Sequence, residues 1–532
     1  MTKNKKLILG ASHSVIEPLG LLHLSAIAKQ EGWVPNVVLG KEPDFKEIDN
    51  AINQFDPSLL GFTLYTGNHI YALKYFEQLK AQRPDIKIAV GGPHVTSFPK
   101  QLIGHADYIA VSEGFESFRR ILRGEAKPGI IVPAKLERFP LADREDFYRN
   151  SPAHRDNPIK NIITQTGCPY QCTYCYNSHT IEEIAESLDS SQKIQVEKVL
   201  GPSKRLFPRS VRPVEDIVQE IEDIKRISPE TRMIFFQDDS FGADLNWLRE
   251  FSRKYDRQIQ FHAMTRFNFI DPKTSAGKER AKLMKEAGCT GLTLAIESAD
   301  DVIRKEVLNR NMDEDVMFRA MDYAGQLGLK VRTFSMIGLP YGATSQPTEM
   351  NFEQDIKTLK LNVQLKEKTG LPTIAWTSIL VPYPTTEIDK YCQQHGFYAG
   401  GDYNDVLQIS YRRGSVLNFP GKWTGPGLSK DSNSWLPENE QRKYQHQLEK
   451  LMEAFPVFAM LENGHEIARE ALTNGIKHWD FYSFVTSKEV LSKIPRSSEF
   501  LEDLTKINNP SGIQINNAFR THIYDRVLYG VK

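Results

Sequence analysis

The chain contains few cysteines, no net charge and no long apolar run. Only 5 of its 532 residues are cysteines, and Lys plus Arg (67) equals Asp plus Glu (67). Balanced charge gives no general attraction to nucleic acid or to an anionic membrane. No apolar run approaches the roughly 20 residues of a membrane span, and the start MTKNKKLILG lacks the apolar core and cleavage site of a signal peptide. We therefore expect a cytoplasmic protein, in which clustered cysteines indicate metal or redox chemistry rather than disulfides.

Residues 1–125 alternate strand-like and helix-like segments. Apolar runs at 6–10, 59–66, 86–92 and 106–114 predict strands. Because parallel strands need crossover connections, this alternation predicts a doubly wound, Rossmann-like α/β domain. Ligands of such sheets bind at the carboxyl ends of the strands, where the glycine-bearing turns at 61–67, 91–94 and 112–114 fall.

The rest of the chain predicts two further domains, in keeping with its length. Residues 126–158 carry five prolines among many charges and are expected to form a linker. Six strand candidates separated by amphipathic helices follow in residues 159–394. They predict a partial (β/α)6 TIM-like barrel with its site at the carboxyl ends of the strands. Residues 395–532 are expected to form a mostly helical domain that caps the substrate.

Three of the five cysteines lie together in TQTGCPYQCTYCYNS, residues 164–178. They are Cys168, Cys172 and Cys175, whereas Cys289 and Cys392 are isolated. A structural zinc site usually takes two separated pairs of ligands, although His179 could complete a Cys3His site, so zinc stays open on spacing alone. Three thiolates on a four-iron cluster leave one iron open for chemistry.

The Cys-x3-Cys-x2-Cys spacing, with Tyr174 before the last cysteine, resembles the radical S-adenosylmethionine (radical SAM) superfamily. The resemblance extends from residue 160 to about 390, through FFQDDSFG, AGCTGLTLAIES followed by LNRN, KVRTFSMIGLP and ILVPYPTTEI. It implies that the three cysteines ligate a 4Fe–4S cluster whose open iron is chelated by SAM. Reductive cleavage of SAM would give a 5′-deoxyadenosyl radical, with electrons from a donor such as flavodoxin or ferredoxin.

The resemblance also implies residues that contact SAM. Tyr174 is expected beside the cluster and the adenine, unless it is only a packed aromatic. Asp239 and Glu297 are acceptors suited to the SAM ammonium and ribose hydroxyls. Asp238 has an alternative role in closing its loop.

Two further SAM contacts are expected on the fifth strand of the barrel. Arg332 is suited to the SAM carboxylate through its bidentate fork, with a structural salt bridge as its alternative. Gly338 lets the backbone approach the adenine, or serves only the turn. Arg266 fits either role of Arg332.

The first domain resembles the cobalamin-binding domain that precedes the barrel in one branch of this superfamily. The matching stretches are PLGLLHLSAIAKQEGW, LLGFTLYTGNH, KIAVGGPHVTSFP and ADYIAVSEGFESF, and Ser112-Glu113-Gly114-Phe115 stands where Gly-Glu-Gly-Glu is usual. The expected cobalamin contacts are Ser12, His13, Leu19, Gly20, Thr66, Gly91, Gly92, Pro93, Glu113 and Gly114. The alternative is a flavodoxin-like domain that has lost the cofactor.

The loop after the first strand bears on the lower axial ligand of cobalamin. The motif that supplies a histidine ligand reads Asp-x-His-x-x-Gly, but Ala11 and Ile16 replace its Asp and Gly here. A histidine ligand needs a partner to orient it. Base-off cobalamin without a histidine ligand is therefore favoured over ligation by His13.

Together the resemblances imply a cobalamin-dependent radical SAM methyltransferase. The radical would abstract hydrogen from an unactivated carbon of a small molecule or natural-product intermediate, and methylcobalamin would donate the methyl group. Cyclisation or rearrangement without methylation, on the same cofactors, is the main alternative. Methylthiotransfer would need a second cluster and more cysteines. A non-catalytic sensor is argued against by the SAM motifs. The aromatic stretches YRRGSVLNFPGKW (411–423) and NGIKHWDFY (474–482) either line a substrate pocket or pack as a cap.

Overall fold

The computed structural model describes residues 5–136, 138–340, 351–395, 397, 415–417, 438–473 and 479–530. The chain divides into two compact units. Unit 1 comprises residues 1–171 with 175–239, and unit 2 comprises residues 172–174 with 240–532. In these described ranges no helix has the length and hydropathy needed to span a membrane.

Unit 1 is built on a parallel six-stranded sheet with the order β2-β1-β3-β4-β5-β6. Its strands are β1 Lys6–Ser12, β2 Val34–Gly40, β3 Leu59–Thr63, β4 Lys87–Gly91, β5 Tyr108–Ala110 and β6 Gly129–Ile131. Its helices are α1 Leu19–Gln30, α2 Lys46–Phe55, α3 His69–Gln82, α4 Pro93–Ser97 and α5 Phe115–Leu122. The order is that of a doubly wound, Rossmann-like sheet, which confirms the predicted architecture.

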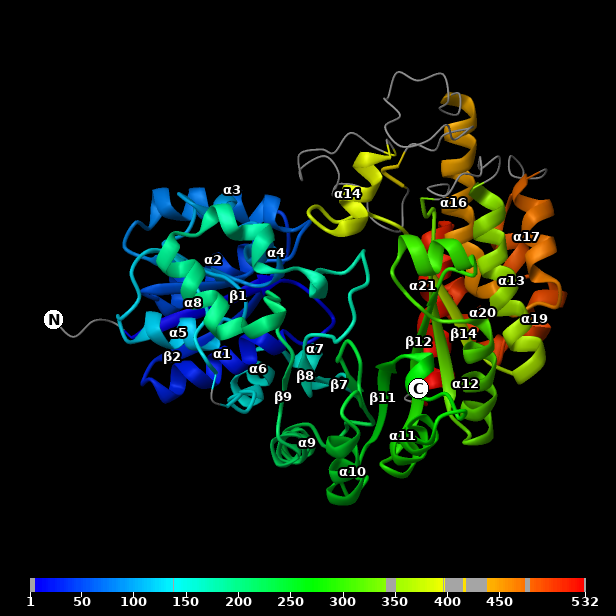
Figure 1. Ribbon diagram of the computed structural model, residues 1–532, viewed down its shortest axis with the longest axis horizontal. Helices are drawn as coiled ribbons and strands as arrows, with labels where there is room; N and C mark the ends of the chain where they lie inside the picture. Colours follow the sequence, from blue (N-terminus) through cyan, green and yellow to red (C-terminus); the bar gives the residue numbers. More distant parts are fainter. Residues whose placement is uncertain are drawn as a thin grey trace. The chain divides into compact units, whose positions relative to one another are not determined.

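Helices cover both faces of this sheet (Figure 1). Buried side chains of α2 and α3, such as Ile48 and Phe76, pack on one face with Phe62 of β3. Buried side chains of α1 and α5, such as Leu22 and Phe118, pack on the other. A sheet covered on both faces exposes its edges and the ends of its strands, and the loops after the carboxyl ends are therefore free to form a site.

Two strands of this sheet were not predicted from the sequence. VPNVVLG forms β2, and β6 lies within the proline-bearing stretch expected as a linker. That stretch also holds α6 Arg144–Asn150 and α7 Pro152–Arg155. Buried Arg144 forms ion pairs with Glu17 (3.0 Å) and Glu220 (2.6 Å), which anchor α6 within unit 1.

The six strands predicted for the second domain are all present. Unit 1 contains the parallel pair β7 Ile159–Ile162 and β10 Met233–Phe236. Unit 2 contains β11 Gln260–Thr265, β12 Cys289–Glu297, β13 Lys330–Ile337 and β14 Ile374–Ile379, which pair in parallel in this order. The remaining strands and α-helices described in unit 1 are β8 Gln165–Thr166, β9 Ser210–Val211, α8 Ser190–Leu200 and α9 Val214–Ile227.

Helices complete unit 2. Those between strands are α10 Leu245–Lys254, α11 Ser275–Glu286, α12 Glu314–Gln326 and α13 Asn351–Thr369, followed by α14 Glu387–Gln394. The later ones are α16 Glu438–Phe458, α17 Gly464–Thr473, α18 Phe481–Val485, α19 Lys488–Lys493, α20 Ser497–Thr505 and α21 Gly512–His522, which continues as a π-helical turn over Ile523–Leu528. The helical C-terminal region confirms the prediction, and α16 packs against β14.

The predicted aromatic pocket cannot be placed. Most of 411–423 and residues 474–478 lie outside the described residues, so a substrate pocket there stays a prediction.

Candidate functional site

The three clustered cysteines follow β7 and β8. None forms a disulfide, Cys172 is buried, and Cys168 and Cys175 are half-buried. Within unit 2, Nη1 of Arg266 lies 3.8 Å from Cys172 Sγ. An arginine N–H donor thus lies against one of the three cysteine sulfurs, the ligand type that iron–sulfur clusters use. The donor chemistry thus fits an iron–sulfur cluster, although in the described part of the chain no three Cys, His, Asp or Glu side chains already form a metal-binding group.

Tyr174 connects the cysteine loop to the carboxyl end of β12. Its hydroxyl donates to Oε1 of Glu297 over 2.7 Å, and Arg310 Nη1 approaches the same carboxylate oxygen at 3.7 Å. Glu297 is buried and has φ 66°, a backbone conformation rare for a residue with a side chain. Its Oε2 has no hydrogen-bond partner among the described residues. A buried orphan carboxylate oxygen fits the ammonium and hydroxyl groups of SAM.

Arg310 is a residue that the sequence argument missed. It donates to Ala295 O (2.6 Å) and to the Tyr174 hydroxyl (3.3 Å), so it connects β12 with the cysteine loop. Burial raises the pKa of Tyr174 well above its ordinary value, and the charge of Glu297 raises it further, so the phenol keeps its proton. Arg310 belongs to LNRN, one of the stretches that carry the family resemblance, but no role was predicted for this arginine.

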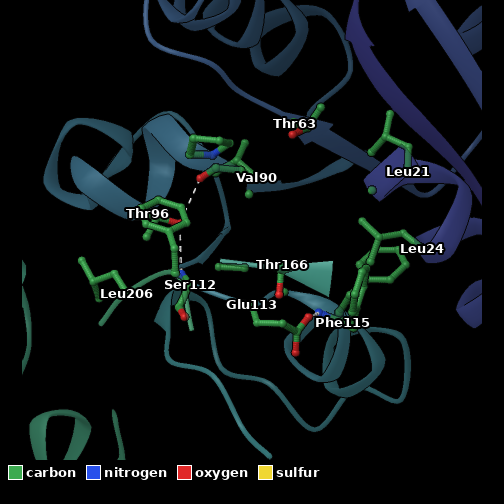
Figure 2. Close-up of a pocket in the computed structure, with 18 of the residues that line it drawn as sticks. Leu21, Leu24, Thr63, Val90, Thr96, Ser112, Glu113, Phe115, Thr166 and Leu206 are labelled. Carbon is green, nitrogen blue, oxygen red and sulfur yellow. Dashed lines mark hydrogen bonds between the residues drawn. The ribbon is translucent and has the colours of Figure 1, made fainter. Parts of the chain in front are cut away.

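A cavity of about 350 Å³ opens in unit 1 at the carboxyl ends of β3, β4 and β5 (Figure 2). Ligand pockets commonly have volumes of about 300–1,000 Å³. The predicted contacts Gly20, Gly91, Gly92, Pro93, Glu113 and Gly114 line it, together with residues that include Leu21, Leu24, Thr63, Val90, Thr96, Phe115, Thr166, Leu206 and Asp239. Most of this wall is apolar, with glycine backbone at several points.

Two buried polar atoms at this cavity lack partners among the described residues. They are Ser112 Oγ and Glu113 Oε2. Burial raises the pKa of Glu113 to about 7, although the hydrogen bond from the Phe115 amide opposes the rise. Near neutral pH this carboxyl is therefore protonated in part, and its protonated form can donate as well as accept hydrogen bonds. Together with Gly114, where an added Cβ would meet no atom within 4 Å, these groups fit a bulky ligand with amide edges, such as a corrin.

Hydrogen bonds hold the two glycine turns of this cavity together. Thr96 Oγ1 donates to Gly92 O and accepts from the Ser112 amide, both at 3.0 Å (Figure 2). Ser112 has φ 63°, in the left-handed region that favours glycine, and it occupies the position where the family pattern has glycine. Ser112 therefore adopts a backbone conformation that glycine takes at lower cost.

Four predicted cobalamin contacts lie outside the lining of this cavity. They are Ser12, His13, Leu19 and Thr66. His13 is exposed, and its amide donates to Gly40 O. Thr66 Oγ1 instead lies 3.2 Å from both His94 Nδ1 and the hydroxyl of Tyr176, which follows Cys175.

The two predicted aspartates after β10 have different surroundings. Asp238 is buried and accepts hydrogen bonds from the amide and hydroxyl of Thr164, so it joins the loops after β7 and β10. This is the loop-closing role given as its alternative. Burial raises the Asp238 pKa to about 7 despite these hydrogen bonds. Asp239 lines the unit 1 cavity and is hydrogen-bonded by Asn177.

A second cavity, also of about 350 Å³, lies in unit 2 beside β13 and β14. Its lining residues are Tyr174, Arg332, Phe334, Met336, Trp376, Ser378, Ile379, Leu380, Val381, Tyr383, Arg520 and Tyr524. Arg332 is the third residue of β13, near the amino end of the strand, and its Nε donates to Thr293 Oγ1 (3.0 Å).

Gly338 follows the other end of β13 with φ 68°. Its amide donates to Oδ1 of Asp355 (2.8 Å), whose Oδ2 accepts from the Tyr444 hydroxyl (2.7 Å). An added Cβ at Gly338 would lie 3.1 Å from Leu448 of α16. The turn thus requires glycine for its conformation, and Asp355 and Tyr444 hold it in place.

Two family models match the chain in the order of these sites. The B12 binding domain matches residues 5–122, and the radical SAM superfamily matches residues 162–350. The chain belongs to the cobalamin-binding radical SAM family. The first match covers most of the loops that form the unit 1 cavity, and the second covers the cysteine loop with Glu297 and Arg332.

Relatives of this family member cover most of its length. It is 23% identical to an uncharacterized methyltransferase of Pyrococcus horikoshii, over 70% of this chain and 78% of that one. It is 20% identical to the cytidylyl-2-hydroxyethylphosphonate methyltransferase of Streptomyces wedmorensis, over 72% and 75% of the two chains. The structure of the cobalamin-dependent S-adenosylmethionine radical enzyme OxsB with aqua-cobalamin aligns with a TM-score of 0.62 at 13% identity, covering 99% and 85%. This likeness establishes the common fold.

Proposed function

We propose that this chain is a cobalamin-dependent radical SAM methyltransferase that methylates an unactivated carbon of a small molecule. The observation that carries the proposal is that one chain holds both a glycine-walled cavity at the carboxyl ends of β3–β5 and a three-cysteine loop joined to Glu297. Two relatives over 70% or more of the chain are named methyltransferases. When bound, the cluster and SAM supply a 5′-deoxyadenosyl radical and cobalamin supplies the methyl group.

The residues of the cysteine loop have separate roles in this proposal. Cys168, Cys172 and Cys175 ligate the cluster, and Arg266 offsets negative charge at Cys172. Tyr174 fixes the Oε1 of Glu297, which leaves Oε2 to accept from SAM.

The unit 1 cavity is proposed to bind cobalamin through backbone and neutral polar groups. Gly91, Gly92 and Gly114 let the backbone approach the ligand, and Ser112 Oγ and Glu113 Oε2 meet its amide side chains. The base-off form without a histidine ligand is favoured, because His13 lies outside the lining of the cavity. Reducing equivalents are expected from a flavodoxin or ferredoxin, and no nucleic acid is proposed as substrate.

Anaerobic reconstitution of the full chain with iron, sulfide and cobalamin tests this function. We expect cluster and base-off cobalamin absorption in one protein, and cleavage of SAM when a reductant is added. Cleavage of SAM by a protein that does not retain cobalamin would contradict the methyltransferase assignment and leave only radical SAM chemistry. Retention of cobalamin without SAM cleavage would contradict the catalytic assignment.

A further inference from the structure

We call the part of the unit 2 cavity lined by β13 its floor, and this floor is charged at one end and apolar at the other. Arg332, Phe334 and Met336 are alternate residues of β13, and therefore share one face of the sheet. Trp376 and Ser378 line the same cavity from β14. The face contributed by β13 thus changes from a cation near the amino end of the strand to apolar groups near the carboxyl end.

The charge on this lining is all of one sign. Arg332 and Arg520 are the charged side chains among the described residues that line the cavity, and no Asp or Glu is among them. Both arginines are half-buried. Charged groups interact more strongly in such a partly desolvated cavity than in water. Guanidinium groups bind carboxylates and phosphates through paired N–H donors.

Each arginine is held in a fixed position. The guanidinium carbon of Arg520 lies 3.7 Å from the centroid of the Trp376 ring. That of Arg332 lies 5.2 Å from the centroid of Tyr524, and its Nε donates to Thr293. Stacking and hydrogen bonding reduce the conformational entropy that each side chain would lose on binding a ligand.

The pKa of Tyr524 indicates a positive electrostatic potential beside the two arginines. Burial by itself raises the pKa of the phenol, but the charges of Arg332 and Arg520, together with their hydrogen bonds to the phenol, outweigh burial and lower the pKa below its ordinary value. The protein therefore stabilises a negatively charged oxygen at this point. The same two positive charges would stabilise the anionic oxygen of a ligand that binds beside Arg332 and Arg520.

The two arginines are offset along the sheet from Glu297, the residue proposed to accept from SAM. Glu297 pairs with Ser335 of β13, three residues beyond Arg332, which corresponds to about 10 Å at the usual rise of a strand. Tyr174, the neighbour of Glu297, lines the same cavity. One cavity therefore includes both a residue beside the proposed SAM site and the two arginines.

We propose that Arg332 and Arg520 bind an anionic oxygen group, a carboxylate or a phosphate, at one end of the substrate. The proposal rests on the function proposed above and specifies its substrate class. It also gives Arg332 to the substrate rather than to the SAM carboxylate. The carbon to be methylated would then be separated from the anionic group by part of the length of the cavity.

Equilibrium dialysis of the reconstituted full chain with three matched probes tests this assignment. The probes are benzoate, phenyl phosphate and benzamide, which share an aromatic ring and differ in charge. We expect at least one anion to bind ten-fold or more tightly than neutral benzamide. Tighter binding of phenyl phosphate indicates a phosphate substrate, and tighter binding of benzoate indicates a carboxylate. Equal binding of all three probes, or no binding of either anion, would overturn the proposal.

Variants locate the binding. Arg520→Met and Arg332→Met should each weaken anion binding about ten-fold, whereas Arg520→Lys should retain part of it because the charge remains without the fork. The matched control is Arg249→Met, which removes an exposed arginine paired with Glu279 on α11. Thermal unfolding checks that each variant is folded. If Arg520→Met does not fold, the anion affinity of Arg520→Lys is used in its place to test the role of Arg520. Unchanged anion binding in folded variants of both arginines would overturn the proposal.

Competition separates this proposal from its main rival and from the proposed function. If SAM displaces the anions and both Arg→Met variants lose SAM affinity ten-fold, the arginines serve the SAM carboxylate and the proposal is wrong. If the wild type binds the anions but neither cleaves SAM nor retains cobalamin, the proposed function fails while the anion site stands. Normal SAM cleavage and cobalamin retention without anion binding would refute only the site.

Discussion

The Tyr174 hydroxyl donates a 2.7 Å hydrogen bond to Glu297 Oε1 and so fixes a residue of the cysteine loop to the last residue of β12. Arg310 contacts both partners. The contact leaves Glu297 with one bonded oxygen and one buried oxygen that has no partner among the described residues. One hydrogen bond thus fixes both the loop proposed to carry the cluster and the carboxylate proposed to contact SAM.

Replacing Glu297 by Gln should weaken SAM binding by roughly 10–100-fold, because a charge-assisted hydrogen bond contributes about 1.5–3 kcal/mol. The amide keeps an acceptor for Tyr174, so the loop should stay in place. Equilibrium binding of SAM to the reconstituted protein measures the effect. Glu306→Gln, at an exposed position a few residues later, is the control. Equal SAM affinity of both variants would remove Glu297 from the site.

Single replacement of Cys168, Cys172 or Cys175 by Ala should abolish the 4Fe–4S cluster and SAM cleavage. Iron analysis and cluster absorption after anaerobic reconstitution provide the measurement. Cys289→Ala is the matched control, since Cys289 is buried at the start of β12 and burial raises the pKa of its thiol to about 12. A full cluster in any of the three variants would refute the ligand set.

Gly114→Leu should eliminate cobalamin binding with little loss of stability. Gly114 has φ −96°, which every residue accepts, and an added Cβ meets no atom within 4 Å, so the side chain would extend into space at the wall of the cavity. Gly114→Ala is the matched control and should weaken binding much less, since it occupies less of the cavity. Cobalamin retained after gel filtration reports binding. Identical retention by the two variants would argue that the corrin binds elsewhere.

The unfolding free energy of the apoprotein should fall as pH rises from about 4 to about 7, in part through Asp355. Burial raises its pKa to about 7 against the hydrogen bonds from Tyr444 and Gly338, so the folded state holds a proton that the unfolded chain has already released. Asp355→Asn should remove roughly 3–4 kcal/mol of this fall, since the pKa rises by about three units and one unit corresponds to about 1.4 kcal/mol. Urea unfolding at a series of pH values measures it. Asp315→Asn, at an exposed position on α12, should leave the slope unchanged; an unaltered slope in Asp355→Asn would contradict the assignment.

Local patterns were sufficient for much of the fold and for part of the site. Apolar runs predicted β1, β3, β4 and β5, but β2 was missed because VPNVVLG contains proline and asparagine and lies at the edge of its sheet. Pro35 is compatible with such an edge strand. β6 was missed because three residues within a proline-bearing stretch give no periodic signal.

The site residues that were missed depend on contacts between distant segments. Arg520 and Trp376 are 144 positions apart, and their stacking follows from the packing of α21, which no local pattern encodes. Thr66 was assigned to the cofactor from its place in a glycine turn, yet its hydroxyl lies beside Tyr176. Cysteine spacing, in contrast, is local, so the cluster motif was visible in the sequence alone.

The central claim is that one chain both cleaves SAM to a radical and carries a SAM-derived methyl group on cobalamin. Isotope transfer tests this claim most directly. The anaerobically reconstituted protein is supplied with SAM bearing a deuterated methyl group, a reductant and cobalamin. The account predicts deuterated methyl on the protein-bound cobalamin together with 5′-deoxyadenosine, and loss of the cobalamin label in Gly114→Leu. Formation of 5′-deoxyadenosine with no label on cobalamin would contradict it.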